Sequence, residues 1–493
     1  MAREKDGVAG ENVELRAENA LLRAENDGLQ GKAEALAAEN VELRSVIARL
    51  EARVTDLEVR LKANPRNSSM PPSAEGLGKP PANRAERRKA KRKPGKQPGD
   101  EGHHLAQVPD PDEVILHRPA RCPACEGELG GAEILDVETR QVFEVPRTRA
   151  HVTEHQLLKV RCSCGCATKA TAPPEATAPA CYGPGVRALA VYLSVYQHVP
   201  YERLAEIFCD LLHMPVSVGA IKTMVGEAGS GLGLFLDVVT GLLRDAPAVH
   251  FDETGGRVEG SLHWIHVAST SLYTLLMCHK RRGTVAMDHM GVIAEMAGVA
   301  IHDGWKPYRS YEVVHALCNA HHLRELTGVV DTLGQEWATE MIDLLLDAKE
   351  AVESAVARGA EHLDGSTLHS IRIRYGKLIA AGWNLNPKHV RGRPWGPARK
   401  KAVNLLERLD THRHDVLRFT VDFAVPFDNN QGERDIRMVK LQQKISGSWR
   451  TKVGADNFCA VRSYVSTMKK HGYDVLAGLR QLFEGQVWLP GET

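Results

Sequence analysis

The chain has 493 residues, which is enough for several domains, including one with a substantial hydrophobic core. Its 63 lysine and arginine residues nearly balance 62 aspartate and glutamate residues, so affinity for a polyanion must come from local basic patches rather than from a basic whole. The N-terminus lacks the apolar segment of a signal peptide, and the longest apolar stretch, residues 231–243, is too short to cross a bilayer. We therefore expect a cytoplasmic protein without a membrane segment.

Residues 12–61 carry an unbroken heptad repeat. Leucine recurs every seven residues, at Leu15, Leu22, Leu29, Leu36, Leu43, Leu50 and Leu57. The other seam position holds Asn12, Asn19, Asn26, Ala33, Asn40, Ile47, Val54 and Leu61. A lone amphipathic helix would not need so strict a period, whereas this pattern is typical of a parallel two-stranded coiled coil. We predict a leucine zipper that joins two copies of the chain as a homodimer.

From residue 62 to residue 104 the periodicity disappears, and proline, glycine, serine, lysine and arginine dominate. The bases that stand out are Arg87, Arg88, Lys91 and Arg92. This composition is typical of a solvated linker. The same bases could contact phosphates as a disordered arm, and the two interpretations are compatible.

Residues 105–175 contain five of the ten cysteines, a pattern that suits a metal site in a reducing compartment better than a disulfide framework. Cys122 and Cys125 have the spacing of a zinc knuckle. The second cluster offers three thiols for two places, with each of three pairs possible: Cys162, Cys164 and Cys166. Strand-like alternation separates the two clusters, so we predict a small zinc-binding β domain.

Residues 180–230 show helical apolar patterns over 186–197 and 201–212, and a third helix is predicted to begin at Ser217, a residue suited to an N-cap. The last two helices are joined by a short turn and resemble a helix-turn-helix. Many helix pairs share this appearance, so DNA reading and simple core packing both remain open.

Residues 246–325 read as the first part of an α/β domain. The pattern predicts strands and one helix in this order: a strand that begins at 248 and ends near Asp252, strands over 262–269 and 272–278, a helix over 284–297, and a strand over 299–303.

Two aspartates occupy similar places in these strands. Val249 and Phe251 alternate with polar neighbours, and Asp252 falls near the end of the first strand. Asp303 closes the last strand in the same way. An aspartate at a strand end is usually a turn residue, so the pair gains meaning only if a further acid arrives from elsewhere in the chain.

Residues 326–424 read as a helical insertion, with helices predicted over 335–358, 366–381 and 397–413. Its loop 388–401 combines bases with Trp395, which suits gripping a DNA end and equally suits an ordinary exposed loop. Just before the insertion, His321 and His322 fall in a predicted helix, where a metal-binding role and a buried supporting role are both possible.

Residues 425–487 form the second part of the α/β domain and supply the third acid. One face of the predicted helix carries an acid followed by three bases: Glu433, Arg437, Lys440 and Lys444. Arg450 follows this helix. A carboxylate among positive charges suits a polyanion cut at a metal centre, because carboxylate oxygens hold the hard cations that activate a water or a hydroxyl.

These motifs together carry a family resemblance. They are His250-Phe-Asp-Glu-Thr254, His302-Asp-Gly-Trp305 with Tyr308, Cys318-Asn-Ala-His321, Phe427-Asp-Asn-Asn430 with Glu433-Arg434 and Arg437, and Lys444-Ile-Ser-Gly-Ser448. In their order and spacing they resemble the insertion-sequence-66 family of bacterial DDE transposases, which have an RNase H-like fold.

The resemblance implies a multidomain protein: an N-terminal coiled coil, a zinc-binding β domain, a helix-turn-helix and an α/β RNase H-like catalytic domain with a helical insertion. It implies that Asp252, Asp303 and Glu433 bind two Mg²⁺ (or Mn²⁺) ions to cleave element ends and join the 3′-hydroxyls to target DNA. It also implies one structural Zn²⁺ on four of the five clustered thiols, two small accessory proteins and a place at the bacterial nucleoid. The bases expected to contact DNA are Arg437, Lys440, Lys444 and Arg450, with those of the linker.

Two other functions share many of these features. A non-catalytic DNA-binding regulator would use the zipper, the basic arm and the zinc module, but it would gain nothing from three uncompensated acids facing DNA. A hydrolytic nuclease with an RNase H-like fold would share the acids and differ only in lacking strand transfer.

Overall fold

The computed structural model describes residues 2–62, 105–146, 148–174, 176, 178–388 and 396–491. The chain divides into two compact units, one of Met1–Gly76, Pro173–Leu204 and Ser217–Thr493, the other of Leu77–Ala172 and Ala205–Val216. The bases expected in the linker, Arg87, Arg88, Lys91 and Arg92, and residues 389–395 of the loop 388–401, with Trp395, lie outside the described residues.

A five-stranded mixed sheet forms the centre of the first unit, in the order β5-β4-β3-β6-β7. Its strands are β3 (Ala248–Val258), β4 (Ser261–Ser269), β5 (Thr274–His279), β6 (Val299–His302) and β7 (Val314–Leu317). The first three are antiparallel, while β6 lies parallel to β3 and β7 parallel to β6. The expected strands are all present, and β7 is an additional strand that the sequence pattern missed, because only its last two residues are buried, whereas all four residues of β6 are.

Strand β3 is longer than predicted, so Asp252 lies inside the strand and not near its end. The hairpin to β4 turns at Glu259 and Gly260, both with positive φ, which keeps residues up to Val258 paired. The parallel pairing of β3 with β6 nevertheless ends at His250. Asp252 therefore stands two residues beyond the last backbone pair that joins β3 to β6.

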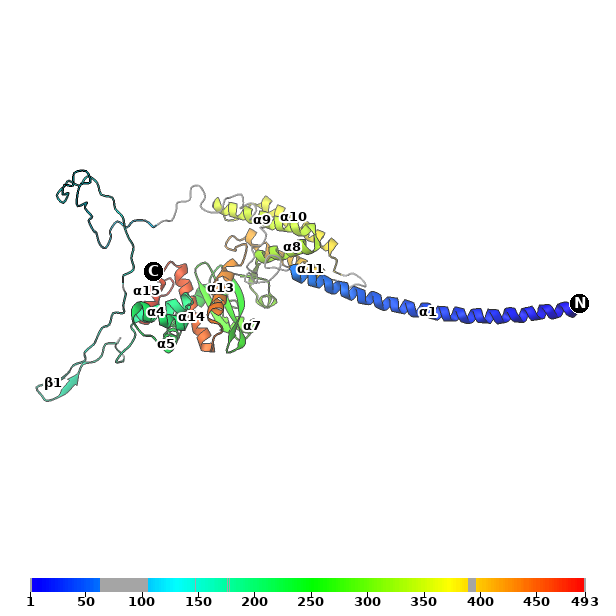
Figure 1. Cartoon of the computed structure of the whole chain (residues 1–493), viewed down its shortest axis with the longest axis horizontal. Helices are drawn as coiled ribbons and strands as arrows, with labels where there is room; N and C mark the ends of the chain where they lie inside the picture. Colours follow the sequence, from blue (N-terminus) through cyan, green and yellow to red (C-terminus); the bar gives the residue numbers. More distant parts are fainter. Residues whose placement is uncertain are drawn as a thin grey trace. The chain divides into compact units, whose positions relative to one another are not determined.

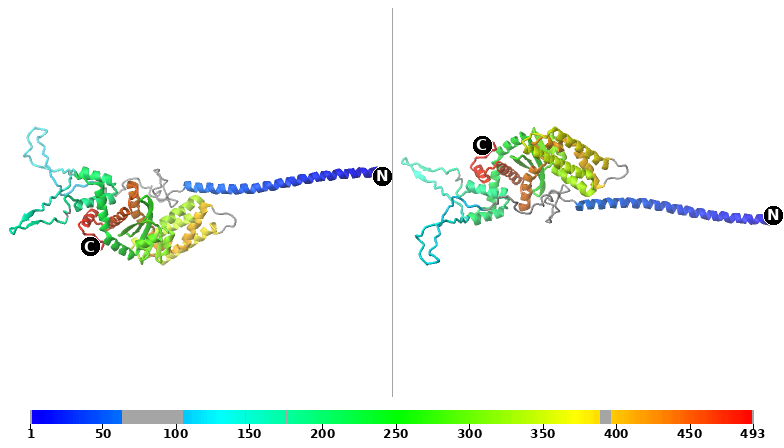
Figure 2. Two further views of the ribbon diagram at one scale, coloured as in Figure 1. Left: turned by 90° about the horizontal axis from the view of Figure 1, so that it is seen from below. Right: turned by 90° about the horizontal axis from the view of Figure 1, so that it is seen from above.

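Helices pack along the sheet (Figures 1 and 2). Helix α14 (Lys452–Lys470) is tied to β5, because Ser463 Oγ accepts from Leu276 N at 2.8 Å and Thr467 Oγ1 accepts from Thr274 N at 3.1 Å. Helix α13 (Asn430–Ser446) lies against β3 and β4. The contact at Gly256 is close, since a Cβ there would stand 2.6 Å from Gln443 Nε2 and 2.9 Å from Ile265 Cδ1, so a larger residue would require these side chains to shift.

Further helices complete the layer around α14: α3 (Pro184–Val191), the π-turn Tyr192–Tyr196, α5 (Val218–Ser230), α6 (Gly233–Arg244) and α15 (Val475–Phe483). Ser217 is the predicted N-cap of α5, and its side chain accepts from Ala220 N at 3.1 Å. Helix α7 (Thr284–Met290) is shorter than expected and ends at Gly291, which has a φ of 70°.

The insertion is helical, as predicted. It consists of α8 (Asn319–Leu333), α9 (Glu336–Ala357), α10 (Gly365–Leu385), α11 (Pro397–Thr411), α12 (Arg413–Val416) and the 3-10 turn Arg418–Thr420. A separate hydrophobic core, centred on residues such as Trp337, Met341, Tyr375 and Leu406, holds these helices together.

Helix α1 (Ala2–Lys62) is continuous over 61 residues, roughly 90 Å at the rise of an α-helix. Its heptad leucines with described side chains are between 51 % and 59 % exposed: Leu22, Leu29, Leu36, Leu43, Leu50 and Leu57. The apolar seam is thus open to solvent in the single chain.

The second unit carries both cysteine clusters, and its β structure is smaller than predicted. Strands β1 (Lys159–Arg161) and β2 (Ala167–Lys169) form one hairpin, and a single bridge links Arg121 to Glu128. Among the described residues between 132 and 158 no strand forms, because the backbone of this alternating stretch finds no partner strand.

No single helix of the described residues is long and apolar enough to cross a membrane, although the bent pair α5 and α6 meets the same criterion of length and composition when taken together.

Candidate active site

The pairing of β3 with β6 brings two of the predicted acids level with each other. The register joins Ala248 to Val299 and His250 to Ile301. Continuing this register places Asp252 beside Asp303. Burial raises the pKa of Asp252 well above its usual value, and the charges of nearby acids, including Asp303 and Glu433, raise it further.

Glu433 reaches the same place from the first turn of α13. The start of this helix is fastened to β3 by Asn429, whose Oδ1 lies 2.8 Å from His250 Nδ1 and whose Nδ2 donates to the Phe251 carbonyl at 2.8 Å. From α8, Arg324 donates to Glu433 Oε1 at 3.4 Å, and His321 Nε2 lies 3.9 Å from the same oxygen. Strands and helices far apart in the sequence therefore bring the three acids close enough for their charges to act on one another, although within the described residues their ligand atoms do not all lie within 4.8 Å of one another.

Among the described residues, the hydrogen bonds of the three acids use only one oxygen of each carboxylate. Asp252 Oδ1 accepts from Glu253 N at 2.8 Å, and Asp303 Oδ1 accepts from Trp305 N at 2.8 Å. Within the described residues, the second oxygen of each aspartate and Oε2 of Glu433 have no hydrogen-bond partner. Each acid thus keeps one oxygen for a ligand, and an all-oxygen donor set suits Mg²⁺ or Mn²⁺.

Glu433 also belongs to a second group of possible metal ligands, which includes a sulfur and a nitrogen atom. Ligand atoms of Cys318, His321 and Glu433 lie within 4.8 Å of one another among the described residues. Burial raises the pKa of the Cys318 thiol to about 12, which favours a protonated thiol over a metal-binding thiolate. The Cys318 Sγ instead accepts from Asn429 N at 3.2 Å, so this side chain helps to place the start of α13.

Sequence reasoning missed a network directly beside Asp252. The Glu253 side chain is only 2 % exposed. Its Oε1 accepts from Arg282 Nε at 2.9 Å and from Arg282 NH2 at 2.6 Å, and its Oε2 accepts from the Tyr308 hydroxyl at 2.7 Å. Burial raises the pKa of Glu253, while the Tyr308 hydroxyl and the Arg282 charge act against that rise.

The same arginine fixes the loop that carries Asp303. The Arg282 guanidinium carbon lies 3.9 Å from the centre of the Trp305 ring and 4.8 Å from that of Trp264. Tyr308 stacks on His302 with ring centres 4.4 Å apart. The motifs contain Glu253, Trp305 and Tyr308, but nothing in the sequence signals Arg282, which lies in the turn after β5.

Comparison with protein families matches residues 179–457 to a model described as Transposase IS66 family, more than half of the chain and all three acids. The chain belongs to the IS66 family of transposases. Residues 10–106 match a family of unknown function (DUF6444), which covers the heptad segment and the linker. A comparison with characterised proteins returned no match.

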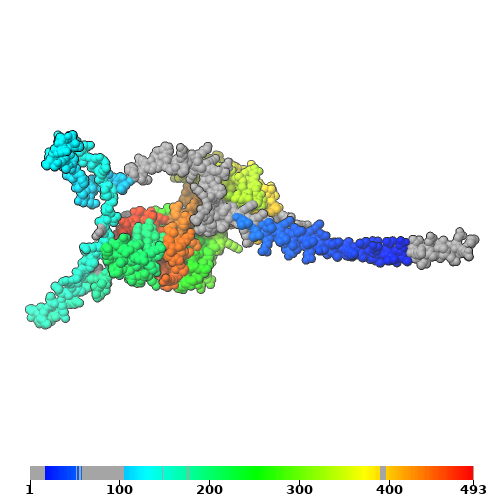
Figure 3. Space-filling view, viewed as in Figure 1, coloured from blue at the N-terminus to red at the C-terminus, as the bar shows by residue number. Residues whose placement is uncertain are grey.

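For a transposase, the exposed bases near the acids are of interest. Arg437, Lys440, Lys444 and Arg450 are all exposed, and the orange stretch that includes α13 lies open on the face seen in Figure 3. Lys440 differs from the expectation, because its Nζ donates to the Gly255 carbonyl at 2.7 Å and helps to hold α13 on β3. Within the described residues the other three form no ion pair.

From its place two residues after Glu433 on the helix, we expect Asp435 to point away from the acids and to tolerate replacement, but it is no neutral surface residue. It forms an ion pair with Lys470 at 2.7 Å, and both side chains are almost buried. Thr274 Oγ1 lies 3.3 Å from the same carboxylate. The pair links α13 to α14, so Asp435 stabilises the transposase fold rather than tolerating change.

The exposed side of α5, the second helix of the predicted helix-turn-helix, carries few side chains that could contact DNA. Its core side consists of Ile221, Met224, Val225, Ala228 and Gly229. The exposed side carries one base, Lys222, and Glu227 there pairs with Arg187. Core packing explains the buried side of α5, and the helix-turn-helix stays a prediction.

The clustered thiols lie in two turns of the second unit. In the first, Glu126 N donates to the Cys122 carbonyl at 2.8 Å, and in the second, Gly165 N donates to the Cys162 carbonyl at 2.9 Å. Backbone amides and a neighbouring cysteine lower the pKa values of Cys122 and Cys162. Lowered pKa values favour the thiolates that zinc requires. The described residues do not bring three of these thiols within mutual ligand distance, so the four-thiol zinc site stays a prediction.

Proposed function

We propose that this IS66-family transposase cleaves the ends of its element and joins the freed 3′-hydroxyls to target DNA. The observation that carries the proposal is the convergence of Asp252, Asp303 and Glu433 from β3, β6 and α13. The sheet order β5-β4-β3-β6-β7, with three antiparallel strands followed by two parallel ones, supports an RNase H-like catalytic domain.

The three acids are the residues that would hold two Mg²⁺ or Mn²⁺ ions. The fit rests on their oxygen donors and on the raised pKa of Asp252, since crowded carboxylates are relieved by a cation. When bound, such ions supply activation of the attacking oxygen and stabilisation of the departing one. Arg324 and His321 hold Glu433 in place, and the network of Glu253 and Arg282 holds the Asp303 loop.

Around this centre, Arg437, Lys444 and Arg450 are the exposed bases that we assign to DNA phosphates, with Lys440 in the structural role described above and with Arg87, Arg88, Lys91 and Arg92 of the linker. We also propose that one Zn²⁺ stabilises the second unit, that two chains pair through the heptads of α1, and that two accessory proteins act alongside. The open leucine seam of α1 supports the homodimer, which would tether two active sites for two element ends. The DNA substrate places the protein at the nucleoid.

The test is cleavage of a DNA duplex that carries the element end, with Mg²⁺, by Asp252→Asn, Asp303→Asn and Glu433→Gln variants. Each amide keeps the side-chain shape but loses the charge that holds a hard cation, so cleavage and joining should both be abolished while DNA binding persists. Full cleavage by any variant would remove that residue from the site.

The reaction products distinguish the alternatives. Joined products from the wild-type protein identify a transposase, and cleavage without joining identifies a nuclease. Binding without either product, in the presence of Mg²⁺ and Mn²⁺, would mean a DNA-binding regulator and would overturn the proposal.

A further inference from the structure

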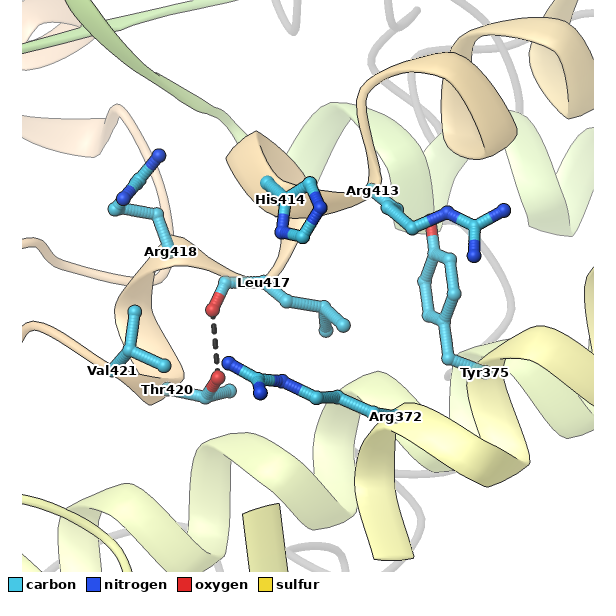
Figure 4. A pocket seen from close by; sticks show the side chains of 8 residues that line it. All are labelled: Arg372, Tyr375, Arg413, His414, Leu417, Arg418, Thr420 and Val421. Carbon is cyan, nitrogen blue, oxygen red and sulfur yellow. Dashed lines mark hydrogen bonds between the residues drawn. The ribbon is translucent and has the colours of Figure 1, made fainter. Parts of the chain in front are cut away.

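The helical insertion contains a cavity of about 310 Å³ that the site described above does not use (Figure 4). It lies between α10 and the segment from α12 to Val421. Three arginines and a histidine line it, namely Arg372, Arg413, Arg418 and His414, and no aspartate or glutamate does. Its volume is at the small end of the roughly 300–1,000 Å³ of ligand clefts, which suits one compact group.

Only part of the positive charge around this cavity is neutralised. Arg413 pairs with Asp410 at 2.6 Å. Arg418 lies 3.8 Å from Asp415, but that carboxylate already pairs with Arg309 at 2.6 Å. The Nε of Arg418 is buried and has no hydrogen-bond partner within the described residues.

Arg372 has the most available charge. Among the described residues it forms neither a hydrogen bond nor an ion pair, and His414 has no hydrogen-bond partner either. Figure 4 shows Arg372 extending from α10 toward Leu417 and Thr420. The Thr420 hydroxyl donates a hydrogen bond to the Leu417 carbonyl at 2.7 Å. The guanidinium of Arg372 therefore points its donors into a carboxylate-free space.

We propose that this cavity binds a phosphate group, and that the group belongs to the backbone of the DNA on which the transposase acts. The identity of the phosphate as DNA rests on the proposed function, whereas the phosphate chemistry rests on the cavity alone. The planar guanidinium of Arg372 presents two parallel N–H donors that match phosphate oxygens. The insertion then extends the DNA contact beyond α13.

The matched pair of variants is Arg372→Ala and Arg374→Ala. Both remove one exposed arginine from α10, but Arg374 lies on another face of the helix and pairs with Asp347 at 3.4 Å. Affinity for a random-sequence duplex is measured without Mg²⁺ between 0.05 and 0.3 M salt, conditions chosen so that no cleavage intervenes. Losing one phosphate contact should make the slope of log K against log salt shallower by about 0.9 and weaken binding about eightfold at 0.1 M. Arg374→Ala should keep the wild-type slope.

A second arm measures the binding of inorganic pyrophosphate to the same proteins by calorimetry. Arg372→Ala should lose this binding and Arg374→Ala should keep it. Loss of pyrophosphate binding with an unchanged DNA slope would overturn the assignment to DNA and leave a site for a free phosphate. Equal behaviour of the two variants in both arms, with unchanged melting temperatures, would overturn the cavity as a phosphate site. Failure of the wild-type protein to bind DNA would count against the proposed function instead.

Discussion

Replacing Arg282 tests whether the network beside Asp252 holds the active site. Arg282→Met keeps an apolar chain between the two indole rings but removes the charge. The Glu253 carboxylate, only 2 % exposed, would keep the Tyr308 hydroxyl as its one side-chain donor. Removing one partner of a buried pair costs about 3–5 kcal/mol, and because Arg282 is 35 % exposed we expect less than this, about 2–3 kcal/mol, with the lost cation–π contacts included.

The loss of stability caused by Arg282→Met should depend on pH. Burial raises the folded-state pKa of Glu253, and losing the Arg282 charge should raise it further. A buried carboxyl with a raised pKa costs nothing while it is protonated and costs most once it is ionised. The destabilisation of Arg282→Met should therefore be largest near pH 8 and should shrink as the pH falls toward about 4.3, the ordinary value for glutamate.

The assay is chemical denaturation followed by tryptophan fluorescence at pH 8 and pH 5, together with Mg²⁺-dependent cleavage. Adding Glu253→Gln to Arg282→Met should recover part of the lost stability, because no charge remains to be buried. Cleavage should fall in the single variant, since the Asp303 loop packs on Arg282 through Trp305. A pH-independent loss, or a double variant less stable than Arg282→Met alone, would refute the reasoning.

Four further outcomes are expected. Asp252→Asn should make the metal-free protein more stable at neutral pH, because the carboxyl it removes has a raised pKa, and Mg²⁺ should no longer raise its Tm; an unchanged Mg²⁺ effect would contradict this. Asp435→Asn should cost about 2–4 kcal/mol, because the buried Lys470 charge loses its counter-ion and keeps only the Thr270 and Tyr273 carbonyls, while a Tm equal to that of the wild type would deny the pair its role. Cysteines placed at Asn19 should cross-link two chains readily, and a monomer in solution would exclude the parallel zipper. Elemental analysis should find one Zn²⁺ per chain, and single replacements should identify the spare thiol among Cys162, Cys164 and Cys166.

The sequence alone determined the elements whose patterns are local. The heptads of residues 12–61 predict a long helix because a seven-residue period is a property of one segment, and α1 is continuous over that segment. Alternation around Phe251 predicts β3, and Ser217 predicts the N-cap of α5, for the same reason. The motif spacing also identified the family, and the helical insertion follows from helical periods that need no partner to be read.

Only the tertiary structure decided which side chains meet. The parallel register of β3 and β6 sets Asp252 beside Asp303, and a register depends on two segments rather than on either one. Arg282 joins the site because the turn after β5 returns toward β3, and Lys440 becomes a structural donor because α13 approaches Gly255. Strand β7 buries only two of its four residues and so gives little apolar signal, and it forms because β6 offers a parallel edge. Periodicity records which face of an element is buried, whereas the contacts that build a site depend on what that face is buried against.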